Sequence, residues 1–170
     1  MNLALITARM VQNADALKGL ASGVAEEQAR WRPAPDMWSV LEVVNHLLDE
    51  EKQDFRTRLD LLLHHPAKPW PEIDPQGWCV ERNYNQRDMA SSVAAFLGER
   101  QRSIAWLQGL QDPAWDNTYR HPLWGEIKAG TLLASWLAHD LLHIRQLTKL
   151  HFEFFLRQNK PYLTDYAGKW

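Results

Sequence analysis

The sequence predicts an all-α protein, a four-helix bundle whose helices are joined by long crossover loops. Three observations favour this fold class. Apolar residues recur at steps of three and four over four separate stretches, as on the buried face of a helix. Proline-rich segments without this pattern separate the stretches. No stretch shows the strict alternation of apolar and polar residues that is typical of a half-buried β-strand.

The first expected helix begins near Asn2 and carries a seam of apolar side chains on one face. The steps alternate between three and four residues, as in a heptad repeat, and Asn13 fills the gap in the seam. The seam residues are Leu3, Ile6, Met10, Leu17, Leu20 and Val24. We expect this helix to end before Trp31, because Pro33 and Pro35 cannot continue it.

The second expected helix begins at Ser39 and runs to about His64. Ser39 and Glu42 have the spacing of a capping box, in which each side chain satisfies a free backbone N–H of the first turn. Apolar residues follow at helical spacing as far as Leu62. Residues 65–84 then form a long connection rich in Pro and Trp, and a loop of that length in a compact domain is usually functional.

The third and fourth expected helices follow, with an aromatic loop between them. Asn85 is the expected cap of the third helix, which stops near Asp112, and the loop spans residues 113–130. Thr131 is a good cap for the fourth helix, which is the most apolar of the four. Residues 152–158 either continue this helix or break from it.

Length, composition and charge limit the classes of function. The 170 residues suit a single domain spanning 1–170, and 45% hydrophobic with 24% charged residues is ordinary for a globular protein. A formal net charge of -2 with scattered Lys and Arg gives no reason to expect nucleic acid or a membrane surface as partner. With no run long enough to span a membrane and no secretory signal pattern, we expect a cytoplasmic protein. The single cysteine, Cys79, cannot form an internal disulfide, and we expect a packed thiol rather than a nucleophile.

His139 and His143 lie four residues apart on the fourth expected helix. Side chains at this spacing stand one above the other, which suits two imidazoles bound to one metal ion. Both fall inside the apolar arc of the helix, where an imidazole needs a hydrogen-bond partner or a metal. Because seven histidines in 170 residues often produce one such pair by chance, the spacing leaves two alternatives open. The pair either binds a metal or is satisfied by a neighbouring carboxylate or carbonyl.

His46, on the second expected helix, is the candidate for a third ligand. It lies away from the main apolar stripe of its helix, which centres on Val44 and Leu62. Either this helix is covered on two sides, or His46 points to solvent. Glu42 and Glu50 lie one turn to either side of His46, and either carboxylate could orient its second ring nitrogen.

Several motifs around these histidines occur in order along the chain. They are Trp38-Ser39 through His46-Leu47 with Glu50, then Trp124-Gly125, the run His139 to Gln146, and residues 166–170. Together they resemble the DinB-like (damage-inducible) superfamily of metal-binding four-helix bundles. The resemblance implies a bundle with a long crossover, often dimeric, and a metal site formed by His46, His139 and His143. Characterised members include transferases that use low-molecular-weight thiols such as bacillithiol and mycothiol, whereas many others have no established activity.

Three imidazoles leave coordination positions open, which is typical of a catalytic metal site. Because the resemblance points to thiol chemistry and no obvious general base for water stands out, we expect a metal-dependent enzyme that binds a low-molecular-weight thiol and presents it to a small electrophilic substrate. The alternatives are a metal-dependent hydrolase and a non-catalytic metal-binding or stress-response module. The expected cofactor is a divalent transition metal such as Zn, Ni or Fe, because all-nitrogen ligation suits each of them.

Further residues are candidates for accessory roles. Aromatic residues of the two long loops are expected to wall a pocket for the electrophile. These are Trp70, Trp78, Tyr84, Trp115 and Trp124. Arg100 could bind a substrate carboxylate if it faced the bundle, although a surface position is the more common one for arginine. Glu50 is a second accessory candidate. The apolar seam of the first helix and the nine tryptophans predict a homodimer.

Overall fold

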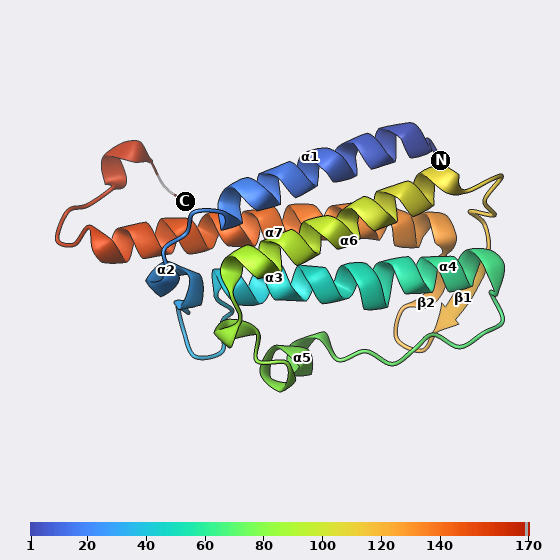
Figure 1. The fold of residues 1–170 in the computed structure, drawn as a ribbon, viewed down its shortest axis with the longest axis horizontal. Helices are drawn as coiled ribbons and strands as arrows, with labels where there is room; N and C mark the ends of the chain where they lie inside the picture. The colour runs from blue at the N-terminus through green and yellow to red at the C-terminus, as the bar shows by residue number, and fades with distance from the viewer. Residues whose placement is uncertain (169) are drawn as a thin grey trace.

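Four long helical segments form the protein, in the order that the sequence predicts (Figure 1). The computed structural model describes residues 1–168 and 170, so Lys169 of the C-terminal motif lies outside the described residues. The segments are α1 (Leu3–Ala21), α3 (Val40–Asp49) continued by a π-helical turn (Glu50–Phe55) into α4 (Arg56–His64), α6 (Met89–Gly109) and α7 (Ala129–Gln158). The predicted all-α fold class is confirmed.

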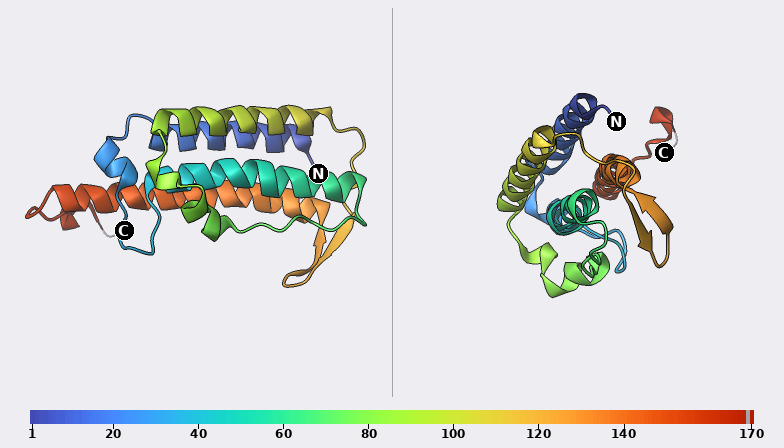
Figure 2. Two further views of the ribbon diagram at one scale, coloured as in Figure 1. Left: turned by 60° about the horizontal axis from the view of Figure 1, so that its bottom comes forward. Right: turned by 90° about the vertical axis from the view of Figure 1, so that its right-hand side faces the viewer.

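The segments pack in two layers, with α1 beside α6 in one layer and the α3–α4 segment beside α7 in the other (Figure 2). α1 and α7 run in one direction, whereas α3–α4 and α6 run in the other (Figure 1). Residues 65–88 must therefore travel back along the bundle to join two helices that point the same way. This segment is the predicted long crossover. None of the helices in the described residues has both the length and the apolar character needed to cross a lipid bilayer.

The first helix is shorter than predicted. Asn2 caps it through its side chain, as expected, but α1 ends at Ala21 rather than before Trp31. Gly23 follows with a φ of 75°, a backbone conformation that glycine adopts without strain. A separate short helix, α2 (Glu26–Arg30), then covers one end of the bundle. The apolar spacing continued across this turn, so it gave no sign of the break.

The second helical segment contains a feature that its periodicity did not predict. The capping box at its start is present, since Ser39 N donates to Glu42 Oε2 (2.8 Å) and Glu42 N donates to Ser39 Oγ (3.2 Å). Further along, the turn at Glu50–Phe55 is π-helical. Such a turn holds one residue more than an α-helical turn, and it often marks a functional site.

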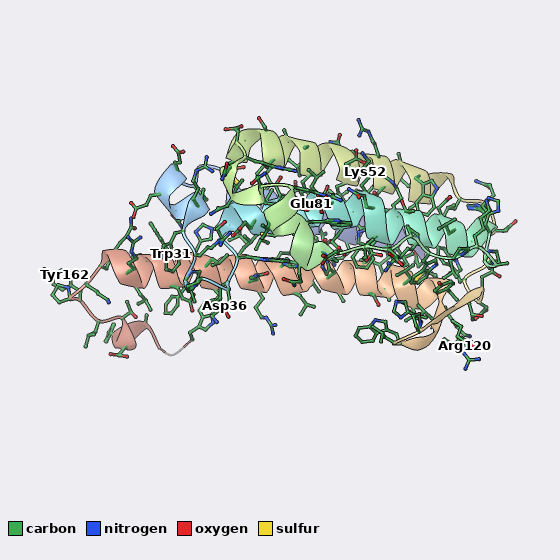
Figure 3. All side chains as sticks on the ribbon, turned by 90° about the horizontal axis from the view of Figure 1, so that it is seen from below. Trp31, Asp36, Lys52, Glu81, Arg120 and Tyr162 are labelled. Carbon is green, nitrogen blue, oxygen red and sulfur yellow. The ribbon has the colours of Figure 1, made fainter. Side chains whose placement is uncertain are left out.

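Both long connections contain secondary structure that was expected to be loop. The crossover carries α5 (Pro75–Glu81) and a 3-10 turn at Tyr84–Gln86. The second connection is a hairpin of β1 (Thr118–His121) and β2 (Gly125–Lys128), beside the start of α7 in Figure 3, where Arg120 is labelled. The expectation of no strand is therefore wrong. Each strand has four residues, which is too short for alternation to be recognised in a sequence.

The starts of the last two long helices also differ from the prediction. Asp88, rather than Asn85, caps α6. α7 begins at Ala129 instead of Thr131 because strand β2 leads directly into it, and no side chain caps it. The helix then runs without a break to Gln158, so residues 152–158 continue it.

A polar layer divides the interior of the bundle into two apolar clusters. One cluster includes Met10, Phe55, Leu107 and Trp136, and the other includes Leu17, Leu47, Phe96 and Leu147. Between these levels, each of the four segments contributes one buried polar side chain to a single hydrogen-bonded network. The four side chains are Asn13, Glu51, Arg100 and Asp140. The polar residues thus meet in the middle of the bundle, at the level from which α7 presents its histidines.

Candidate metal centre

Three histidines converge between the two helical segments of one layer. His46 comes from α3, and His139 and His143 come from α7. His139 Nε2 lies 3.3 Å from His46 Nε2 and 3.0 Å from His143 Nε2, and the ligand atoms of all three lie within 4.8 Å of one another. Nitrogens bound at ~2.1 Å to one ion, in octahedral or tetrahedral geometry, would be about 3.0–3.4 Å apart. The two separations measured from His139 Nε2 therefore fit a single ion, and the third pair lies within 4.8 Å.

The π-helical turn explains why His46 looked misplaced in the sequence. At about 100° per residue, one extra residue turns everything after it by that angle relative to α3. The apolar stripe at Leu59 and Leu62 consequently lies closer to the side of His46 than a uniform helix would place it. The other face is covered too, because α5 packs on α3. His46 is 5% exposed, so the helix is covered on two sides and the solvent-facing alternative is wrong.

Burial keeps the three imidazoles in the neutral form that binds a metal. Desolvation lowers the pKa of His46 to about 2, and the positive charges that His143 and His139 would carry lower it further. Desolvation also lowers the pKa of His139 to about 3, with smaller contributions from His143 and Arg100. The pKa of His143 is lowered as well, mainly by burial. All three rings are therefore neutral near pH 7, and no proton has to be displaced when a metal binds.

Neighbouring side chains hold two of the rings. His143 Nδ1 donates to Gln146 Oε1 (2.7 Å), which leaves the lone pair of Nε2 directed at the other histidines. Trp38 packs over the site, with its ring centroid 4.7 Å from that of His46 and 6.5 Å from that of His143. A histidine that donates from Nδ1 keeps the lone pair of Nε2 available to a metal ion. This tautomer of His143, with Trp38 packed over the rings, is typical of metal ligands rather than of imidazoles that only hydrogen-bond to one another.

Neither carboxylate expected to orient His46 does so. Within the described part of the chain, His46 Nδ1 has no protein hydrogen-bond partner. Glu42 instead completes the capping box, pairs with Arg32 and accepts a hydrogen bond from Cys79 Sγ (3.0 Å). Burial and this hydrogen bond raise the pKa of the Cys79 thiol to about 12, which agrees with a packed thiol rather than a nucleophile.

Glu50 lies in the same cavity as the histidines. It is the first residue of the π-helical turn and is buried, and its Oε1 has no protein hydrogen-bond partner among the described residues. Burial and the carboxyl of Asp54 raise the pKa of Glu50 to about 8. Asp54 itself pairs with Arg58 (2.8 Å). With a pKa raised from the acidic range toward neutrality, Glu50 can exchange a proton with a group in the cavity.

Two cavities meet at His139. The first, of about 570 Å³, is open and lies in front of all three histidines; Asp36, labelled in Figure 3, and Gln76 of α5 also line it. The second, of about 660 Å³, lies between α4, α7 and the hairpin and includes Trp70 and Trp124 in its wall. His139 lines both cavities, so its ring forms part of the boundary between them.

The aromatic residues expected to wall a pocket divide into two groups. Trp70 and Trp124 line the second cavity, as expected. Trp78 and Tyr84 are instead buried together between α5 and the bundle, and Trp115 packs on the main apolar cluster. The sequence could not separate the two groups, because the hairpin and α5 were both read as loop.

Arg100 is 1% exposed, so the expected surface position is wrong. Its Nη2 lies 2.8 Å from Glu51 Oε2, and its Nη1 lies 2.6 Å from Asp140 Oδ2. Asn13 Nδ2 also donates to Asp140 Oδ2 (3.1 Å). Because its guanidinium is occupied by two buried carboxylates, Arg100 does not offer the expected site for a substrate carboxylate. These partners lie on other helices, where sequence periodicity cannot identify them.

Comparison with known proteins gives a family and a fold. The family model described as the DinB superfamily matches residues 9–147. Among solved structures, the chain is similar to one described as YfiT from Bacillus subtilis, a probable metal-dependent hydrolase with an unusual four-helix bundle topology. The TM-score is 0.79 at 21% sequence identity, over 89% of this chain and 87% of that chain. At this identity the likeness shows the fold alone. No curated protein matches the chain.

Proposed function

Because this chain belongs to the DinB superfamily, we propose that it is a metal-dependent enzyme in which His46, His139 and His143 hold one divalent transition metal ion. The neutral, converging nitrogens fit Zn, Ni or Fe. When bound, the ion supplies an open position at which the pKa of a water molecule or of a thiol falls toward neutrality. The remaining chemistry depends on the side chains around the cavity.

Hydrolysis is the reaction that the site supports best, and Glu50 is the residue that favours it. A water molecule that attacks an electrophile must lose a proton, and the sequence offered no clear base for this step. The buried carboxyl of Glu50 lines the same cavity as the three histidines, with one oxygen unpartnered among the described residues. Its carboxylate form can take the proton from water and return it to the leaving group, so that water is added across the cleaved bond. The description of YfiT as a probable metal-dependent hydrolase agrees with this proposal.

Transfer of a low-molecular-weight thiol is the second candidate, and the pair of cavities favours it. A transferase must hold two substrates side by side, and two cavities of similar size share His139. The open cavity could take the thiol and the second cavity the electrophile. Glu50 would then receive the thiol proton, the sulfur would form a bond to the electrophilic carbon, and the leaving group would depart. The family resemblance supports this alternative.

One set of assays distinguishes these proposals. The protein is purified without a His tag, its metal content is measured, and it is loaded with Zn, Ni or Fe in turn. Esters, amides, activated halides and epoxides are then tested with and without a panel of cellular thiols. Turnover in water alone that disappears in His143→Ala supports hydrolysis. Turnover that requires a thiol supports transfer, and a bound metal without any turnover supports the non-catalytic module.

A further inference from the structure

The second cavity indicates which part of a substrate the protein holds. We infer that this cavity binds an uncharged, ring-containing apolar group of the substrate, so that the reacting end lies beside His139. The inference rests on the proposed function, because it names the substrate class of that same site. At about 660 Å³, the cavity falls within the range of roughly 300–1,000 Å³ that is usual for small-molecule sites.

The wall of the cavity is largely apolar and comes from four parts of the chain. Its apolar residues are Phe55, Trp70, Trp124, Ile127, Leu132, Ala138 and Leu142. Trp70 is held flat against Tyr119 of β1, with ring centroids 4.3 Å apart and an interplanar angle of 9°. Trp124 lies at the turn of the hairpin and is 76% exposed. One fixed indole and one exposed indole beside the same cavity suit a ligand with a flat ring.

The cavity is connected to the histidine site through one ring. Phe55 belongs to its wall, and the Phe55 ring centroid lies 5.1 Å from that of His139. His139 also lines the open cavity. Its Nε2 lies next to the Nε2 atoms of His46 and His143. A molecule that fills the second cavity therefore contacts the imidazole that belongs to the metal site. A cavity unrelated to the metal site would not have one of the proposed metal ligands, His139, in its wall.

The charged groups at the cavity favour a neutral ligand over an anion. Arg58 lines the cavity and lies over the Trp70 ring, with Cζ 4.9 Å from its centroid. Its charge is already balanced by Asp54 (2.8 Å), and Glu126 adds a negative charge to the same wall. In the metal-free protein, a ligand carboxylate would bring a further negative charge to a wall whose one arginine is already paired.

A pair of probes that differ only in charge tests the inference. 2-Naphthamide and 2-naphthoate have the same ring, and calorimetry would measure their binding to the metal-free protein, because a bound zinc ion would itself attract the carboxylate. We expect the amide to bind at least tenfold more tightly than the carboxylate. Trp70→Ala and Trp124→Ala should each weaken amide binding at least tenfold.

Controls separate failure of this inference from failure of the proposed function. Trp170→Ala removes an exposed indole that stacks on Phe152 at the other end of α7, and it should leave the affinity unchanged. His143→Ala should still bind the amide even though it no longer binds zinc. Equal or tighter binding of the carboxylate would overturn the inference, as would unchanged affinity in both Trp70→Ala and Trp124→Ala proteins of normal helicity. Either result could be obtained with a protein that still binds zinc through its histidines. It would therefore contradict the inference about the second cavity without contradicting the proposed metal site.

Discussion

Arg100 and Asp140 form an ion pair in the middle of the bundle, with Arg100 Nη1 2.6 Å from Asp140 Oδ2, and Asp140 directly follows His139 on α7. Both side chains are 1% exposed, and Glu51 completes the network from the neighbouring segment. The pair therefore fixes the rotation of α7 at the level of the metal site. It also separates the two apolar clusters, so the helices cannot slide past one another without breaking it.

Removing Arg100 should destabilise the protein strongly. In Arg100→Leu, the carboxylates of Glu51 and Asp140 would remain buried without their shared cation, a change that typically costs about 3–5 kcal/mol. Urea unfolding followed by circular dichroism would measure the loss. Arg102→Leu is the matched control, because this arginine is on the same helix but largely exposed, and it should change stability by about 1 kcal/mol or less. Similar losses in the two variants would contradict the role assigned to the buried network.

Removing a histidine of the site should abolish metal binding but preserve the fold. We expect His139→Ala and His143→Ala to contain no stoichiometric metal, because two imidazoles bind far more weakly than three. Helicity should persist, since the two apolar clusters hold the helices together. Metal analysis and circular dichroism on the same sample would test both points, with the exposed His64→Ala as control. If helicity disappears together with the metal, the ion is structural and the enzyme proposal is weakened.

The metal-free protein should lose stability as the pH falls below about 6.5. His46 and His139 have a pKa of 6.5 in the unfolded chain, and folding lowers it to about 2 and about 3. Between these values the unfolded chain binds protons that the folded protein excludes, so acid favours unfolding. Each such histidine should contribute a slope of about 1.4 kcal/mol per pH unit. Urea unfolding at several pH values between about 5 and 6.5, with chelator present, would measure this effect. The free energy of unfolding should fall more steeply with decreasing pH in the wild type than in His139→Gln.

Glu50 should have the opposite pH dependence. Its pKa is 4.5 in the unfolded chain and is raised to about 8 on folding, so between these values the folded protein retains a proton that the unfolded chain releases. Its contribution to stability is therefore present below pH 4.5 and is lost as the pH rises toward 8. Glu50→Gln removes this dependence, so its stability relative to the wild type should increase from pH 5 to pH 8.

The same substitution tests the proposed reaction. If Glu50 accepts the proton of attacking water, Glu50→Gln should lower kcat for hydrolysis by about 10²-fold or more. Metal content should be unchanged, because Glu50 is not among the three proposed ligands. The exposed Glu81→Gln is the control for loss of a carboxylate. Full hydrolytic activity in Glu50→Gln would exclude this carboxyl as the base.

The homodimer expected from the sequence remains a prediction, and it now concerns a different face of α1. The seam residues Met10 and Leu17 are buried within the chain, whereas Leu5 is 68% and Val11 47% exposed. We expect light scattering to give the mass of a dimer at micromolar concentration and that of a monomer for Val11→Glu. Leu123→Glu, at an exposed position of the hairpin, should leave the mass unchanged. A monomeric wild type would contradict the prediction.

The sequence predicted those features that depend on neighbours within one helix. Periodic apolar residues located the four long helices, Ser39 and Glu42 located one helix start, and the spacing of His139 and His143 identified a candidate pair. The DinB resemblance is confirmed by the family model that matches residues 9–147. Features that depend on distant segments were missed. They include the covering of α3 by α5, the buried partners of Arg100, and the hairpin that brings Trp124 to the second cavity.

The π-helical turn at Glu50–Phe55 has a consequence for how this chain can vary in length. A one-residue deletion there that restores a regular α-helix removes the residue that the wide turn absorbs, so α4 keeps its rotation relative to α3. Leu59 and Leu62 would therefore stay buried while His46 kept its place. Relatives can thus have one residue fewer between His46 and Leu62 and still present both side chains as here. In an alignment of relatives, a one-residue gap in this stretch should mark the chains whose helix is α-helical throughout.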